Sequence, residues 1–187
     1  MEKKILYFDE PGKANTDATL KLVRERAKEL GINQVVVASS HGYTAKRAKA
    51  ILGDTGVKIV AVSICASYAD AGWTMSPEEK SAVEVLGITV LTGVHALGDD
   101  VSEAFNGDAP NRIVRETLYR FCQGMKVAVE VALMAADAGA IDTSREAISV
   151  AGTGAGADTA IVIKPAFPRK FKELEIREVL AKPRRAA

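Results

Sequence analysis

The stretch that decides the fold runs from residue 33 to residue 50 and reads NQVVVASSHGYTAKRAKA. Its first part, Gln34–Ala38, is a short run of apolar, β-branched residues, which is typical of a strand buried on both faces. From Thr44 to Leu52, apolar residues recur at helical spacing. Small polar residues lie between the two parts. The stretch therefore predicts a strand, a tight turn and a helix.

The turn has the residues of an anion site. A strand that delivers Ser, Ser, His and Gly to a helix start places free backbone N–H groups beside hydroxyls, with the positive end of the helix dipole behind them. Phosphate is the anion most often bound at such a place. An ordinary turn, in which Ser and Thr only cap the helix, would show the same pattern. The stretch alone leaves both interpretations open.

The composition is typical of one compact domain. The chain has 187 residues, of which 48% are hydrophobic and 26% charged, so we expect residues 1–187 to form a single domain with one core. The 25 basic and 24 acidic side chains give a formal net charge of +1. No bulk field therefore attracts nucleic acid or an anionic membrane, and neither is an expected partner. Any bound anion must be held by local contacts.

Cysteine usage and the first residues indicate a cytoplasmic protein. Cys65 and Cys122 lie far apart, on a predicted strand end and inside a predicted helix, which favours free thiols over a disulfide framework. The start, MEKKILYFD, has neither the apolar stretch of a signal peptide nor the length of a membrane span. We therefore expect a cytoplasmic location.

Alternating strand and helix signals indicate parallel βαβ units. Strands are predicted at Lys4–Phe8, Gln34–Ala38, Ile59–Ile64 and Ile88–Thr92, with helices between them. Because such connections are right-handed in nearly all known sheets, helices should cover both faces of the sheet.

One long helix is predicted over Arg112–Ala138, where apolar residues follow a 3.6-residue period. Past Gly124 it is apolar on most faces, so we expect it to pack against the sheet or to form a subunit contact, which leaves a homo-oligomer open. Before it, Gly98–Asn111 is predicted to be a surface loop with a short helical turn. Asp99 and Asp100 could bind a metal there, but the chain has two His and no spaced ligand set, so no metal site is predicted.

The glycine-rich segment from residue 147 to residue 165, AISVAGTGAGADTAIVIKP, is predicted to be a β-hairpin. The Gly-x-Gly-x-x-Gly spacing of a dinucleotide loop fails at Ala157, and no Gly-Lys-Ser/Thr follows as in a Walker motif. We expect the second strand to be antiparallel and to close the sheet edge. The glycine tip can still offer backbone N–H groups to an anion. Further on, Phe171–Ile176 alternates loosely, as an edge strand would.

The two turns together resemble the C-terminal domain of pyruvate kinase. In that family a Val-Val-Val strand runs into a Thr/Ser-x-Ser-Gly-x-Ser/Thr-Ala turn, matched here by Ala38–Ala45. The family's next strand, Ile-Ile-Ala-Val, is matched by Lys58–Val62, and its glycine-rich final hairpin by Gly152–Asp158. The resemblance implies a three-layer α/β/α sandwich whose mostly parallel sheet has an antiparallel final strand.

The resemblance also implies a ligand. In pyruvate kinases with an allosteric effector site, these two loops hold a phosphate of a sugar bisphosphate. This sequence has no counterpart of the catalytic barrel, so pyruvate kinase activity is not implied. The Trp and Arg of the effector hairpin are replaced by AGTGAGA, residues 151–157. The apolar segment Val127–Gly139 and the hairpin are more similar to stand-alone prokaryotic, mostly archaeal, proteins of this fold, for which the implied ligand is flavin mononucleotide (FMN).

The expected ligand is thus a small phosphorylated molecule, FMN first. A site of backbone amides and hydroxyls, without arginine in either turn, suits a single phosphate. Tyr68 and Trp73 offer planar groups to a ring, although covering the core is the commoner role for a residue such as Trp73. The residues expected to contact the ligand are Ser39, Ser40, His41, Gly42, Tyr43, Thr44, Ser63, Thr92, Gly93, His95, Gly152, Thr153, Gly154, Gly156 and Asp158.

Two classes of function stay open. One is a protein that binds a flavin or phosphometabolite and, if it is an enzyme, acts as a flavin-dependent oxidoreductase. The other is a regulatory or assembly module that senses a phosphorylated metabolite without catalysis. A hydrolase is disfavoured, because adjacent Ser and His residues on a turn seldom form a nucleophile–base pair and no Gly-x-Ser-x-Gly elbow is present. His41 is assigned to ligand contact ahead of general-base catalysis, since nothing in the sequence identifies a carboxylate that orients it.

Overall fold

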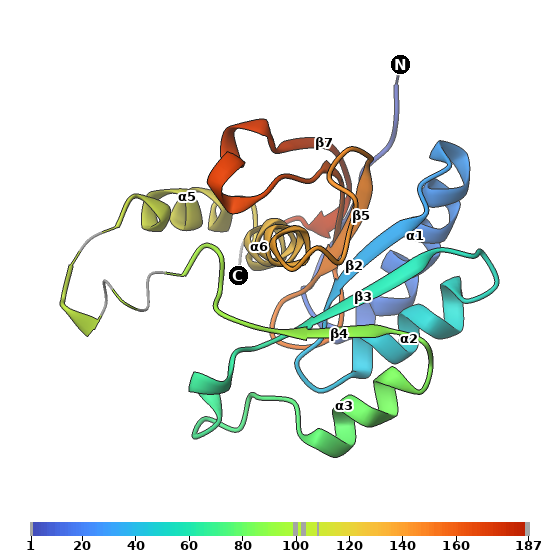
Figure 1. The fold of residues 1–187 in the computed structure, drawn as a ribbon. Coiled ribbons are helices and arrows are strands. Elements are labelled where there is room, and N and C mark those ends of the chain that lie inside the picture. The colour runs from blue at the N-terminus through green and yellow to red at the C-terminus, as the bar shows by residue number, and fades with distance from the viewer. Residues whose placement is uncertain (1, 99–100, 102–103, 108, 186–187) are drawn as a thin grey trace.

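The computed structural model describes residues 2–98, 101, 104–107 and 109–185, and Asp99 and Asp100 lie outside these residues. Seven strands form one sheet in the order β1-β7-β6-β5-β2-β3-β4 (Figure 1). The strands are β1 (Leu6–Phe8), β2 (Gln34–Ala38), β3 (Lys58–Ser63), β4 (Thr89–Thr92), β5 (Ala147–Ala151), β6 (Thr159–Lys164) and β7 (Glu175–Pro183). The helices are α1 (Thr16–Leu30), α2 (Tyr43–Leu52), α3 (Pro77–Glu84), α5 (Pro110–Tyr119) and α6 (Gln123–Asp137), with 3₁₀ turns η1 (Lys13–Asn15), η2 (Ala66–Tyr68) and η3 (Pro168–Glu173). Within the described residues, no helix combines the length and apolar character that a membrane span needs.

Every strand except β6 runs in the same direction. β2 pairs in parallel with β3 and β5, and β3 with β4. β6 is antiparallel to both β5 and β7, and β7 is parallel to β1. The predicted class, a three-layer sandwich with a mostly parallel sheet and antiparallel pairing near the C-terminal end, is confirmed. The hairpin does not close the sheet edge as expected, because β7 and then β1 pair beyond it.

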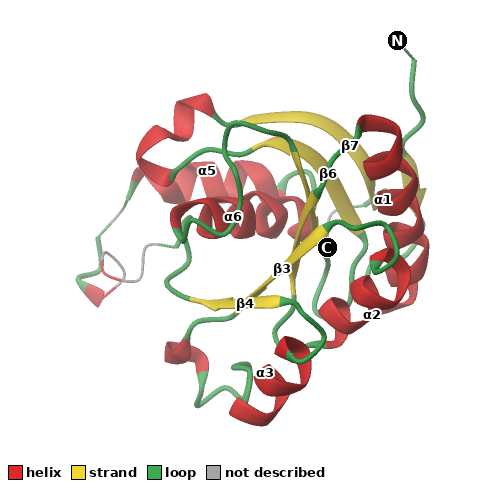
Figure 2. Ribbon diagram, turned by 45° about the vertical axis from the view of Figure 1, so that its right-hand side comes forward, coloured by secondary structure: helices red, strands yellow, loops and turns green. Residues whose placement is uncertain are grey.

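Helices α1, α2 and α3 cover one face of the sheet, and α6 covers the other with α5 and η3 outside it (Figures 1 and 2). The alternation of side chains along β2 shows why both faces are apolar. Val35 and Val37 belong to the core under α1 and α2, whereas Val36 packs under α6. All three are fully buried. Each such burial stabilises the fold by about 1.5–3 kcal/mol.

The single long helix predicted over residues 112–138 is wrong, because the chain forms two helices there. α5 ends at Tyr119 and α6 begins at Gln123. Between them Cys122 has an extended backbone, and its Sγ accepts a hydrogen bond from the Met125 N–H at 3.3 Å, which caps α6. The apolar period continues across this break, so periodicity alone could not reveal it.

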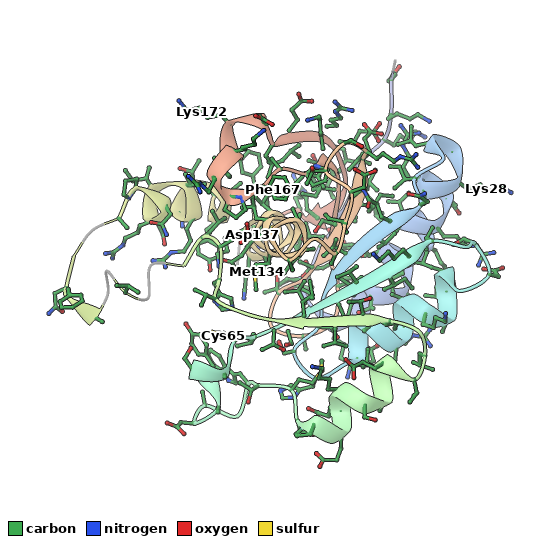
Figure 3. All side chains as sticks on the ribbon, viewed as in Figure 1. Lys28, Cys65, Met134, Asp137, Phe167 and Lys172 are labelled. Carbon is green, nitrogen blue, oxygen red and sulfur yellow. The ribbon has the colours of Figure 1, made fainter. Side chains whose placement is uncertain are left out.

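The start of α6 lies directly against β6. A Cβ atom on Gly124 would lie 2.1 Å from Thr159 Oγ1, so glycine is required for this approach. One helical turn further on, Ser149 of β5 donates a hydrogen bond to the Ala128 carbonyl at 2.7 Å. Met134, labelled in Figure 3, packs into the same apolar cluster as Val36. α6 is therefore fixed to the sheet along its length.

Candidate ligand-binding site

A cavity of about 530 Å³ lies at the carboxyl ends of the central strands. β2 is the strand at which the order of the sheet changes, because β3 and β4 lie on one side of it and β5 on the other. Ligands in open α/β sheets bind at such a point, outside the carboxyl ends of the strands. The loop after β2 and the loop after β5 both line the cavity, so the structure brings together the two turns that the sequence singles out.

The turn between β2 and α2 has unused hydrogen-bond donors. Among the described residues, the backbone N–H groups of residues 40–44 have no hydrogen-bond partner. The hydroxyls of Ser40 and Thr44 have no partner there either, and both residues line the cavity. Tyr43 also lines it, and the Lys13 Nζ atom lies 4.1 Å from the centroid of its ring. The turn therefore presents N–H and O–H donors beside a positive charge at the N-terminus of α2.

Two residues of this turn shape it. Ser39 Oγ accepts a hydrogen bond from the Ala45 N–H at 3.2 Å, so its buried hydroxyl satisfies one free N–H group in the first turn of α2, whose N-cap residue is Gly42. Gly42 has φ +82°, and a Cβ atom on it would lie 2.8 Å from Val83 Cγ2 of α3. Ser39 still lines the cavity, whereas Gly42 lies outside its described lining. Capping and donor presentation thus occur in the same turn, on different residues.

His41 has a carboxylate partner that the sequence did not reveal. Its Nδ1 lies 3.1 Å from Oε2 of Glu79. The same Glu79 oxygen accepts the Ser76 N–H at 2.9 Å, and Ser76 Oγ accepts the Glu79 N–H at 3.2 Å, which is the capping box of α3. The Ser76 N–H, and to a lesser extent His41, hold the pKa of the Glu79 carboxyl below its usual range. Glu79 therefore orients the imidazole at the edge of the cavity.

The hairpin tip after β5 is held by a buried carboxylate. Asp158 accepts hydrogen bonds from the Gly12 N–H at 2.8 Å, the Thr153 N–H at 3.1 Å and the Thr159 hydroxyl at 2.8 Å. Its side chain is therefore occupied in fixing the tip to the chain before α1. Thr153 and Asp158 lie outside the described lining of the cavity. The tip residues that line it are Gly152, Gly154, Ala155 and Gly156.

Close packing explains two of these glycines. A Cβ atom on Gly152 would lie 2.6 Å from the Gly156 carbonyl oxygen, and one on Gly156 would lie 2.4 Å from Thr16 Oγ1. Gly154 differs, because it has φ +71° and open space within 4 Å of the Cβ position. A side chain at Gly154 would therefore act through backbone conformation rather than through a clash.

An aromatic column forms another wall. Tyr68 stacks on Trp73, with ring centroids 5.6 Å apart and an interplanar angle of 13°, and on His95 at 5.8 Å and 27°. All three side chains line the cavity. Trp73 is 54% exposed, so it does not cover the core. The loops after β3 and β4 thus present flat surfaces to the cavity that the turn of residues 39–44 also lines.

Ser63 lines the cavity, but its hydroxyl is used within the sheet. Its Oγ donates to the Leu91 carbonyl at 3.2 Å and lies 2.5 Å from Thr92 Oγ1. Thr92 and Gly93 lie outside the described lining. These residues join β3 to β4 and thereby position the loop that carries His95.

Comparison with known protein families matches residues 17–163 to the alpha/beta domain of pyruvate kinase. The chain belongs to the pyruvate kinase alpha/beta domain family. The matched residues run from α1 to the end of β6 and include both turns of the cavity. β1 and β7 lie outside the match, so in this family member two further strands extend the sheet beyond β6.

The third wall, formed by α5 and α6, was missed by the sequence analysis. Its most notable members are Lys126 and Glu130, an ion pair on α6 whose side chains are 8% and 4% exposed. The available signal was a pair of opposite charges four residues apart in an apolar helix. In the described residues of this family member, no three His, Cys, Asp or Glu side chains gather as a metal site. The lining residues from this wall include Arg115, Glu116, Tyr119, Gln123, Lys126 and Glu130.

Proposed function

We propose that this protein binds FMN, with the phosphate at the 39–44 turn and the hairpin tip, and the ring beside the aromatic column. The observation that carries the proposal is that one cavity brings unused donors at a helix N-terminus together with stacked aromatic side chains. A phosphorylated ligand with a flat ring uses both features.

The donor set suits a single phosphate group. Backbone N–H groups at the start of α2 point along the positive end of the helix dipole, and the Ser40 and Thr44 hydroxyls can donate beside them. The opposite side is closed by the tip that contains Gly154, whose backbone approaches without side chains. Such a set satisfies several oxygens of one phosphate.

The rest of the cavity suits a planar ring. Its volume of about 530 Å³ lies within the range of pockets for small molecules and cofactors, roughly 300–1,000 Å³. The rings of Tyr68 and Trp73 are stacked and nearly parallel, and aromatic rings stack favourably on other flat π-systems. Val127, Val131 and Met134 of α6 add apolar surface to the lining.

The test is the absorption spectrum of the protein as purified, followed by titration of FMN and riboflavin fluorescence. We expect saturable quenching by the protein, with FMN bound more tightly than riboflavin because riboflavin lacks the phosphate. Thr44→Val should weaken FMN binding roughly ten-fold by removing a phosphate donor. The control Thr89→Val alters an exposed residue of β4 and should bind like the parent. A colourless protein that leaves the fluorescence of added FMN unchanged at micromolar concentration would disprove the proposal.

A second candidate is a regulatory module that senses a phosphorylated metabolite without catalysis and assembles with copies of itself. One observation favours it: α5 lines the cavity through Tyr119 and exposes the apolar Ile113 on another side. A ligand that moves α5 would therefore also move an exposed apolar side chain, which a homo-oligomeric contact could bury. Sedimentation with and without FMN or a sugar phosphate tests this candidate. A ligand-dependent change in mass without turnover would support it over a flavin-dependent oxidoreductase.

We also propose a cytoplasmic location. Cys65 and Cys122 are both buried and free, which suits a reducing compartment. Fractionation of the native host tests this location, and we expect the protein in the cytoplasmic fraction, apart from the membranes.

A further inference from the structure

α6 carries one ion pair among its buried residues, and that pair faces the cavity. Lys126 Nζ donates a hydrogen bond to Glu130 Oε2. The other buried residues of α6 are apolar or glycine. Both members of the pair line the cavity together with Val127 and Val131. The pair therefore lies at the boundary between the apolar layer and the ligand space.

Stability does not account for the pair. Removing two charges from water is costly, and replacing a buried ion pair by apolar residues often leaves stability unchanged or raises it. An apolar pair at these two positions would continue the pattern of the helix. A role in the cavity is therefore a better explanation for charged residues at this place.

Glu130 is held by a second contact. Its Oε1 accepts a hydrogen bond from the Leu97 N–H at 3.0 Å. Leu97 belongs to the loop after β4, two residues beyond His95 of the aromatic column. The carboxylate is thus fixed between α6 and that loop, and it holds the Lys126 ammonium in one place.

Lys126 has donor capacity to spare. An ammonium group can donate three hydrogen bonds. Among the described residues, the hydrogen bond of Lys126 Nζ goes to Glu130. Its Nζ also lies 5.8 Å from the centroid of the Tyr119 ring, a weak cation–π distance. A fixed positive group with unused donors on a cavity wall is suited to an acceptor atom of a ligand.

We propose that Lys126 is a positioning residue that donates to the edge of the flavin ring bearing its carbonyl oxygens and ring nitrogens, while Glu130 holds it there. The proposal rests on FMN being the ligand. The phosphate contacts anchor one end of the ligand, and Lys126 gives the ring a second polar anchor. The ring is then fixed in orientation as well as stacked.

The two charges should act in opposite directions on the reduced ligand. Two electrons and one proton convert oxidised FMN to reduced FMN with one additional negative charge on its ring. Charge near the ring nitrogens is one of the ways in which a protein tunes a flavin. The Lys126 ammonium therefore favours the reduced ligand, and the Glu130 carboxylate disfavours it.

The experiment measures the dissociation constants of oxidised FMN and of FMN reduced anaerobically by dithionite, with water as the proton source. In Lys126→Met, the preference for reduced over oxidised FMN should fall roughly ten-fold, which corresponds to a shift of about 30 mV to lower potential for a two-electron couple. In Glu130→Gln the preference should rise. A merely structural role would move both variants in the same direction.

The exposed Lys80–Glu84 pair of α3 has the same spacing and serves as a control. Lys80→Met and Glu84→Gln should leave the preference unchanged, and inorganic phosphate, which competes only at the other end, should bind all variants equally. If Lys126→Met does not fold by circular dichroism, Lys126→Met/Glu130→Leu restores an apolar helix and should bind oxidised FMN roughly ten-fold more weakly. If the wild type binds FMN and the Lys126 and Glu130 variants keep its preference for reduced FMN and its affinity for oxidised FMN, this inference alone is overturned. Absence of FMN binding by the wild type would overturn both proposals.

Discussion

His41 and Glu79 join the turn after β2 to the first turn of α3, with Nδ1 and Oε2 3.1 Å apart. Gly42, the next residue of the turn, packs against Val83 of the same helix. The turn of residues 39–44 therefore rests on α3 at two adjacent points. The start of α3, which is set by its capping box, thereby helps to place the N–H and O–H donors of this turn.

His41→Ala should weaken FMN binding by up to roughly ten-fold, because the imidazole lies at the end of the cavity to which we assign the phosphate. Glu79→Gln should weaken it by a smaller factor, since the imidazole loses the carboxylate that orients it. Because the two side chains act as one unit, the double variant should be little weaker than His41→Ala alone. Fluorescence titration measures all three, with Glu84→Gln as the control on the same helix. Parental affinity in His41→Ala would rule out a ligand role for His41.

Gly154→Val should lower the affinity for FMN and for inorganic phosphate roughly ten-fold. The valine disfavours the left-handed conformation of this residue and so displaces the hairpin tip. Gly56→Val is a matched control, because Gly56 also has a positive φ, +74°, and open space around its Cβ position. It precedes β3 at the amino ends of the parallel strands, away from the cavity. This variant should lose comparable stability and keep its affinity. Calorimetry with circular dichroism separates the two effects, and unchanged binding by a folded Gly154→Val would remove the hairpin from the site.

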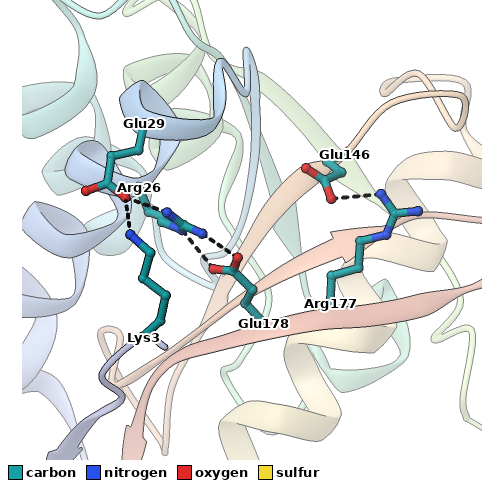
Figure 4. Close-up of polar contacts among 6 residues, drawn as sticks. All are labelled: Lys3, Arg26, Glu29, Glu146, Arg177 and Glu178. Carbon is teal, nitrogen blue, oxygen red and sulfur yellow. Dashed lines mark hydrogen bonds and ion pairs between the residues drawn. The ribbon is translucent and has the colours of Figure 1, made fainter. Parts of the chain in front are cut away.

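A buried arginine links α1 to β7 (Figure 4). Arg26, 8% exposed, donates from Nε to Glu178 Oε2 at 2.8 Å and also donates to Glu29. Lys3 Nζ joins the same Glu29 carboxylate at 3.1 Å. The hydrogen bonds from Arg26 are the main cause that lowers the pKa of the Glu178 carboxyl. The neighbouring pair between Arg177 and Glu146 is more exposed.

Glu178→Gln should lower the free energy of unfolding at pH 7 by roughly 1–3 kcal/mol, because it leaves the Arg26 charge buried without its main partner. Glu146→Gln, the matched control, should cost less than about 1 kcal/mol. Since the folded pKa of Glu178 is lowered, its contribution is present above the ordinary value of 4.5 and is lost as pH falls through the folded value. Urea unfolding from pH 7 to pH 3 measures the free energy of unfolding of the parent and of Glu178→Gln, and the two values should converge in acid. A constant difference would contradict the assignment.

The sequence predicted the elements of the parallel half closely. β2 occupies the predicted residues 34–38, and α2 begins one residue before the predicted start, because a buried apolar run and a polar turn are local signals. Strand order is not local. β1 lies at the far edge beside β7 rather than next to β2, and nothing in the period of either strand specifies its partner.

The site was predicted in the same uneven way. Donor-bearing residues such as Ser40 and Thr44 follow directly from the strand–turn–helix pattern, and they line the cavity. Asp158 was expected to contact the ligand as part of the hairpin tip; its buried carboxylate accepts three hydrogen bonds within the protein, and the residue lies outside the described lining of the cavity. Whether Lys126 and Glu130 face the cavity depends on how α6 is rotated about its own axis. The sequence pattern does not fix this rotation for a helix that is apolar on most faces.

The pairing of β2 with β5 also bears on how the chain folds. The residues opposite each other, such as Val36 and Ser149, are separated in sequence by elements that include α2, β3, α3, β4, α5 and α6. Non-local pairings of this kind form slowly, because the entropy of closing a long loop is lost before the stabilising contacts of the paired strands form. A refolding chain that has built β2, β3 and β4 still lacks the wall of the cavity that the hairpin tip supplies. In a refolding experiment, FMN capture should therefore lag behind the formation of these three strands, because both loops reach the ligand only after β5 has paired with β2.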